Sequence, residues 1–265
     1  MIWMNAIDSW RERTNQDWWY LIQNPIISNQ IYLQRVDVIF NCWYNFYVFI
    51  IFMIQLQQTL IFTLTFFGYA SVHAIREGWS YSKPELEQAF NIERYQLGLV
   101  DTLFLFSYSI GMATIGNMSS KFNLKYYISF GLISASLCYS SFALVYSFTK
   151  KFSYIFACIM MCLNGLFQST VWPGILTAMG NWFGKSNRGL LMGVWGINAN
   201  IGNIIGLVLC NIIEEDEHWS WSSNFLFTGG ISIFIGIMIF LFLQEKPIYN
   251  MQIQTEETIT EKSES

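Results

Sequence analysis

The chain has 265 residues, of which 53% are hydrophobic, 18% aromatic and only 12% charged. Soluble domains carry about 25% charged residues, so this composition excludes an ordinary soluble protein and predicts an all-α membrane protein with several spans in a lipid bilayer. The formal net charge of −4 argues against nucleic acid as a partner.

The first part of the chain, residues 1–58, has no clear structural assignment from sequence. Residues Met1–Gln34 are polar and rich in tryptophan, and they fit either an interfacial helix or a disordered tail. Residues Val36–Ile54 are apolar and aromatic, with polar residues in the first half. This segment fits an extra helix, a helix on the lipid surface or an extension of the helix that follows.

Six membrane spans are predicted in residues 59–243, joined by short connections, and a polar tail follows at 244–265. The first span leads into a polar loop, Arg76–Tyr95, which contains Pro84. Pro173 lies within the fourth span, which we therefore expect to be kinked. The predicted spans are Thr59–Ile75, Leu97–Met118, Tyr126–Phe148, Tyr154–Met179, Gly189–Ile213 and Phe225–Leu243.

The first span ends at an arginine, Arg76, after small and polar residues that include His73. An arginine at a helix end often extends its charged group to the membrane surface. The same residue can instead form an anion site, because its planar fork of donors matches phosphate oxygens. Both interpretations stay open from position alone.

Two further spans carry polar stripes. In the fifth, Gly193, Gly196, Asn200 and Asn203 share one face at helical spacing. Small residues allow close helix packing, whereas the asparagines favour the wall of a cavity, because amides in lipid need partners.

The fourth span carries a similar polar stripe, formed by Gly165, Gln168 and Trp172. It allows the same two interpretations, close packing or a cavity wall.

Asp101, near the start of the second span, is either an ion or proton site or a capping and loop-pairing residue. The sequence contains no nucleophile–base arrangement and no phosphate-cradling glycine loop before a helix. Cys158 and Cys162 share a helix face without further metal ligands nearby and are interpreted as buried thiols. We therefore predict that the chain is not an enzyme and holds no metal or other cofactor.

Four motifs together resemble the N-terminal half of the organophosphate:phosphate antiporters of the major facilitator superfamily, above all the sugar-phosphate exchangers. The resemblance extends from about Thr59 to Pro247 and is most specific in the long third motif. The motifs are FFGYASVHAIRE, DTLFLFSYSIGM, NGLFQSTVWPGILTAMGNWFGKSNRGLLMGVW and NANIGNIIG.

The resemblance implies six transmembrane helices that form one half of a twelve-helix fold, with even-numbered loops and the tail in the cytoplasm. It also implies that the arginine after the first span binds substrate phosphate. The residues expected to bind substrate are Arg76, Gln168, Asn200, Asn203, Trp172 and His73, and those of the gating or loop motif are Asp101, Lys121 and Arg188.

The chain departs from the family pattern at three places. Ser120–Lys121 replaces the usual Asp-Arg pair of the loop between the second and third spans. Glu77 follows Arg76, where relatives carry a basic residue. The sequence Asn198–Ala199–Asn200 occupies the region of a histidine that is common in the fifth span of relatives.

The expected function is exchange of a sugar phosphate or glycerol phosphate for inorganic phosphate, in the endoplasmic reticulum or another internal membrane. Because relatives have two six-helix halves that rock about a central site, we expect no transport by a monomer. The partner would be a second half-transporter chain or a second copy in a homodimer. The alternative is a non-transporting half-transporter that serves as a structural or assembly subunit of a membrane complex.

Overall fold

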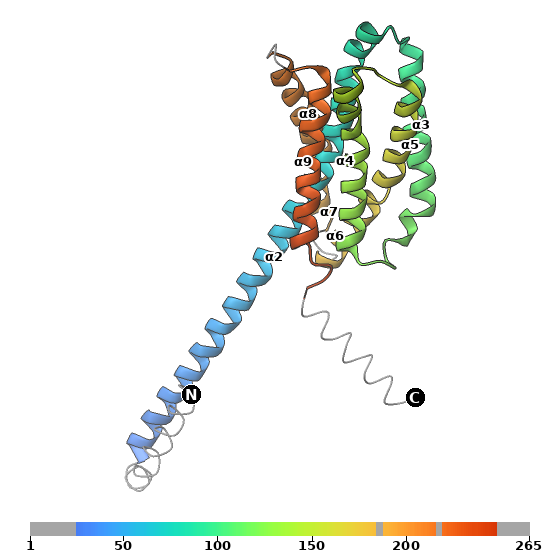
Figure 1. Ribbon diagram of the computed structural model, residues 1–265. Coiled ribbons are helices and arrows are strands. Elements are labelled where there is room, and N and C mark those ends of the chain that lie inside the picture. The colour runs from blue at the N-terminus through green and yellow to red at the C-terminus, as the bar shows by residue number, and fades with distance from the viewer. Residues whose placement is uncertain (1–24, 184–187, 216–218, 248–265) are drawn as a thin grey trace, which may run out of the picture. The chain divides into compact units, whose positions relative to one another are not determined.

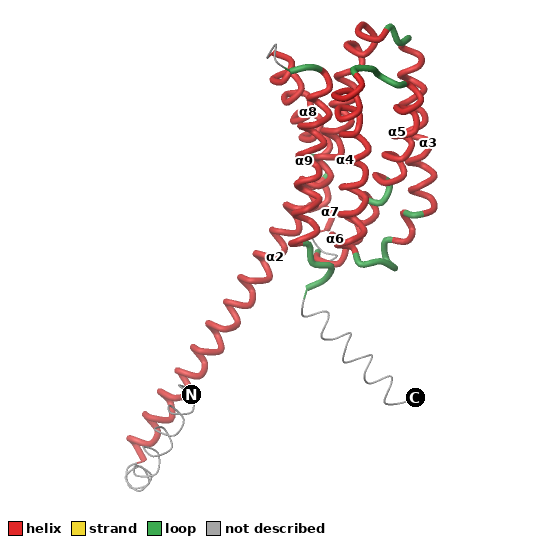
Figure 2. The backbone as a smooth tube through the Cα atoms, in the orientation of Figure 1, coloured by secondary structure: helices red, strands yellow, loops and turns green. Residues whose placement is uncertain are grey.

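The computed structural model describes residues 25–183, 188–215 and 219–247. The expectations for residues 1–24 and for most of the tail lie outside these ranges. The described part consists of helices and connecting loops, without a strand (Figure 2). Contacts divide the chain into two units, residues 1–56 and 57–265. The described part of the first unit is the beginning of one long helix. Residues 57–90 of that helix and all other described helices belong to the second unit.

The helix that carries Arg76 is longer than the sequence predicts. Helix α2 covers Pro25–Phe90, so residues 36–54 extend the following helix, which was one of the three alternatives. The predicted loop at residues 76–95 is wrong, because α2 continues for fourteen residues beyond Arg76. Trp79 and Leu86 are buried in this segment, and their packing outweighs the helix-breaking tendency of Pro84.

The expected kink in the fourth span is a complete break between two helices. Helix α5 covers Tyr154–Gln168 and α6 covers Val171–Trp182. Pro173 has no N–H to donate to the carbonyl of Ser169, four residues earlier, and its ring crowds that carbonyl. The break therefore lies one turn before the proline.

The fifth span is also divided. Helix α7 covers Arg188–Trp195 and α8 covers Asn198–Glu215. The break at Gly196–Ile197 interrupts the glycine–asparagine stripe that the sequence predicts, so its four residues do not share one continuous helix face.

The remaining helices correspond closely to the predicted spans. Six segments of the described chain are long and apolar enough to cross a membrane, which confirms the predicted all-α membrane fold. The remaining elements are α3 (Arg94–Thr114), the short 3-10 helix η1 (Gly116–Met118), α4 (Leu124–Thr149) and α9 (Trp221–Phe242).

The second unit is a bundle in which α3 lies beside α5 and α4 lies beside α9 (Figure 1). Glycines bring the helices together. Around Gly165 of α5, an added Cβ atom would lie only 2.5 Å from the Phe104 carbonyl oxygen and 3.0 Å from the Tyr108 nitrogen of α3. This close approach places the part of α3 that carries Phe104 and Tyr108 against α5.

Two clusters of buried apolar side chains fill the bundle. One contains Ile128, Ile175 and Trp195. The other contains Trp79 and Tyr139 together with further aromatic side chains of α4 and α9. The second cluster forms one wall of the site described below.

We expect Gly165→Ala to destabilise the protein by about 1–3 kcal/mol, because the new methyl group would meet backbone atoms that cannot move aside. Gly98→Ala on α3 is the matched control, since nothing lies within 4 Å of its added Cβ atom, and replacing a helical glycine by alanine is otherwise favourable. Thermal unfolding of both variants in detergent measures the difference. Equal unfolding temperatures would contradict the proposed close contact.

Candidate functional site

Arg76 is held in the bundle by a chain of hydrogen bonds to neutral groups. Its Nε donates to Oε1 of Gln168 at 2.8 Å, and Nε2 of Gln168 donates weakly to Oδ1 of Asn164 at 3.5 Å. The amide of Asn164 in turn donates to the carbonyl oxygen of Ala135 at 2.8 Å. Both amide side chains are only 1% exposed. Arg76 and Gln168, which the sequence predicts to line one site, are therefore in contact, and their binding of a ligand stays a prediction.

Two aromatic rings of α3 also contact the guanidinium group. Its central carbon lies 5.0 Å from the ring centroid of Phe104 and 5.1 Å from that of Tyr108. A cation over an aromatic ring is stabilised by the quadrupole of the ring, whose face is electron-rich. The rings and Gln168 together fix the orientation of Arg76 without neutralising its charge.

One nitrogen of the guanidinium group has no partner in the described part of the chain. The Nη2 atom of Arg76 is buried and has no hydrogen-bond partner. Among the described residues, no carboxylate forms an ion pair with Arg76. Burying an unpaired charge is costly, so this geometry favours an anion that can accept hydrogen bonds from the free end of the group.

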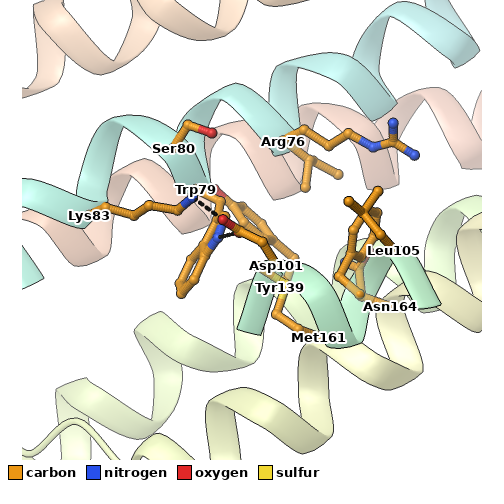
Figure 3. A pocket seen from close by; sticks show the side chains of 11 residues that line it. Arg76, Trp79, Ser80, Lys83, Asp101, Leu105, Tyr139, Met161 and Asn164 are labelled. Atoms are coloured by element: carbon orange, nitrogen blue, oxygen red, sulfur yellow. Dashed lines mark hydrogen bonds and ion pairs between the residues drawn. The ribbon is translucent and has the colours of Figure 1, made fainter. Parts of the chain in front are cut away.

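Arg76 lies at the edge of a cavity of about 240 Å³ between α2, α3, α4 and α5 (Figure 3). Asp101 and Lys83 line the same cavity. Asp101 accepts hydrogen bonds from Trp79 Nε1 at 2.6 Å and from Lys83 Nζ at 2.5 Å. The pairing role expected for Asp101 is thus present, but its partners lie on the last turns of α2 rather than in a loop.

The predicted residues Trp172 and His73 lie in an adjoining aromatic cluster. The ring centroid of Tyr69 lies 4.9 Å from that of Trp172 and 5.1 Å from that of His73. Asn203 of α8 lies next to His73, and Tyr69 lies close to the hydroxyl group of Tyr108. This cluster adjoins the Arg76 site through α2.

Two predicted residues are exposed and lie outside the cavity. Asn200 is exposed on α8, and Lys121 is exposed in the turn after η1. Neither residue lines the cavity. Arg188 is the first residue of α7, and its side chain lies outside the described part of the structure.

Several residues of the site are absent from the sequence prediction. Asn164 lies one helical turn before Gln168, a spacing that places both amides on one face and could have revealed it. Lys83 lies two helical turns after Arg76. The sequence predicts a loop for this segment, so it does not predict that the two residues line one cavity. The ring contacts of Phe104 and Tyr108 have no signal in the sequence, since aromatic residues are frequent throughout the chain.

Comparisons with known proteins agree with this architecture. The family model described as Major Facilitator Superfamily matches residues 65–262. Sugar phosphate exchanger 3 of Homo sapiens is 32% identical over 211 residues, which cover 69% of this chain and 43% of the relative. Glucose-6-phosphate exchanger SLC37A2 of Homo sapiens is 35% identical over 214 residues, which cover 71% of this chain and 42% of the relative. These matches confirm the resemblance to sugar-phosphate exchangers.

The chain spans less than half the length of these curated relatives. A solved structure supports the fold alone. It is the crystal structure of a bacterial homolog to the human lysosomal transporter Spinster, in an inward-facing and occupied conformation, with a TM-score of 0.55 and 17% sequence identity. The match covers 72% of this chain and 44% of the other. With its six membrane-crossing segments, this chain is a multi-pass integral membrane protein that belongs to the Major Facilitator Superfamily.

Proposed function

We propose that this chain forms one half of a carrier that exchanges an organic phosphate, such as a sugar phosphate or glycerol phosphate, for inorganic phosphate. In this proposal Arg76 binds the phosphoryl group. The names of the relatives, a sugar phosphate exchanger and a glucose-6-phosphate exchanger, support this class of substrate. An internal membrane such as the endoplasmic reticulum is the proposed location.

The observation that carries the proposal is the incomplete pairing of Arg76. The guanidinium group is oriented by Gln168 and two aromatic rings, yet its buried Nη2 has no partner. A phosphoryl group offers several charged oxygens to a planar fork of donors. Such a ligand would both complete the hydrogen bonds and compensate the charge.

The proposed carrier needs a second six-helix half. Transporters of this architecture bind substrate near the membrane midplane, between two halves that move against each other. Asn200 is exposed on α8, and an amide facing lipid would lack partners. We propose that a second half-transporter chain, or a second copy of this chain, covers such groups.

We expect Arg76→Lys to weaken the binding of inorganic phosphate at least tenfold. Lysine keeps the positive charge but loses the planar fork, and hydrogen bonds to charged groups contribute about 1.5–3 kcal/mol each. Titration calorimetry of the full chain in lipid nanodiscs measures the dissociation constant.

Arg94→Lys is the control for that measurement, because Arg94 is an arginine of α3 whose side chain is 89% exposed and pairs with Glu87. The dissociation constant of the Arg94→Lys variant for inorganic phosphate should equal that of the unaltered chain. Phosphate binding that is unchanged by Arg76→Lys would show that Arg76 is not the phosphate ligand.

We also expect the functional protein to contain two six-helix halves. Detergent sizing of the protein from its native membrane, with identification of its peptides by mass, should give a complex containing either two copies of this 30.9 kDa chain or this sequence with another six-helix half. Recovery in an unrelated assembly, without phosphate binding, would support the structural or assembly subunit instead.

A further inference from the structure

The cavity beside Arg76 has a second polar end whose groups are only partly used. Lys83 and Asp101 form this end, and their side chains are 23% and 37% exposed. Figure 3 shows Arg76 and Lys83 on the same helix, with Asp101 on the neighbouring one. Leu105 and other apolar side chains also line the cavity.

The second polar end has free capacity to bind hydroxyl groups. Each carboxylate oxygen of Asp101 accepts one hydrogen bond, Oδ1 from Trp79 and Oδ2 from Lys83. A carboxylate has about four acceptor positions and an ammonium group has three donors. Asp101 can therefore accept further hydrogen bonds, and Lys83 can donate them.

The charge at this end favours a neutral group over a second anion. The ammonium group of Lys83 lies 2.5 Å from a carboxylate oxygen of Asp101, so the two charges largely compensate each other. A second phosphate or carboxylate would have to compete with Asp101 for Lys83. A hydroxyl group accepts from Lys83 and donates to Asp101 without that competition.

The separation of the two ends sets the length of the ligand. Arg76 and Lys83 are seven residues apart on α2, which corresponds to about two turns, or roughly 10 Å along the helix. Inorganic phosphate occupies only one end of such a cavity. A phosphorylated sugar of hexose size extends from one end towards the other.

We propose that Lys83 and Asp101 form the subsite for the hydroxyl-bearing end of a hexose phosphate, whose phosphoryl group binds Arg76. This inference rests on the proposed function and extends it to substrate selectivity. Binding of inorganic phosphate depends on Arg76, whereas the preference for the sugar phosphate over inorganic phosphate depends on the Lys83–Asp101 pair.

The test is the ratio of two dissociation constants, for glucose 6-phosphate and for inorganic phosphate, measured on the full chain in lipid nanodiscs. Asp101→Asn keeps an acceptor for Trp79 but removes the carboxylate. We expect the preference for glucose 6-phosphate to fall about tenfold, the loss of one or two hydrogen bonds. Glu87→Gln, at the exposed ion pair of α2 with Arg94, should leave the ratio unchanged.

A second variant does not touch the ion pair. Leu105 lines the cavity but is 55% exposed, so Leu105→Trp reduces the space in the cavity without entering the packed core. It should weaken the binding of glucose 6-phosphate several-fold more than that of inorganic phosphate.

The outcomes separate the two proposals. If Asp101→Asn or Leu105→Trp weakens both ligands by the same factor, or neither, the subsite inference is wrong while phosphate binding at Arg76 stands. If the unaltered chain binds neither ligand even when assembled with its second half, or if binding is unaffected by Arg76→Lys, the proposed function fails and the subsite inference fails with it.

Discussion

The site depends on one constraint, the placement of a guanidinium group among the membrane-spanning helices without a carboxylate partner. A full ion pair would stabilise the charge but would also occupy the groups that a ligand needs. Here a neutral amide, Gln168, and two aromatic rings provide partial stabilisation and leave Nη2 unpaired. The orientation of Arg76 is therefore fixed, while its positive charge is not compensated by a carboxylate of the described residues.

This arrangement is possible because α3 and α5 approach each other closely at Gly165. The glycine leaves room for the backbone of α3 at Phe104 and Tyr108, which brings their rings to one side of Arg76, while Gln168 on α5 contacts it from another. Helix packing and the placement of Arg76 thus depend on the same small residue. In lipid, where apolar burial does not drive helices together, such close backbone contact is a main source of association.

The sequence was sufficient for the spans and the family, since long apolar segments are visible without a structure. It also placed Arg76 and Gln168 among the residues of one site, although it did not predict their hydrogen bond. It failed where tertiary packing overrides local preference. The segment after Arg76 carries Pro84 and charged residues, so it resembles a loop, yet the burial of Trp79 and Leu86 keeps it helical. Because of that error, the sequence did not predict that Lys83 lines the cavity and pairs with Asp101. The divided fifth span was also unpredictable, because glycines occur both in continuous helices and at breaks.

The unpaired end of Arg76 has an energetic consequence for a carrier of the proposed kind. An empty site retains a buried charge with unsatisfied donors, whereas an occupied site does not, so the empty form is the high-energy form during the change between the two faces of the membrane. Return of the empty carrier is then slow compared with return of a loaded one. This asymmetry suppresses leak and makes each outward movement of one anion depend on the inward movement of another, which is the requirement for strict counter-transport.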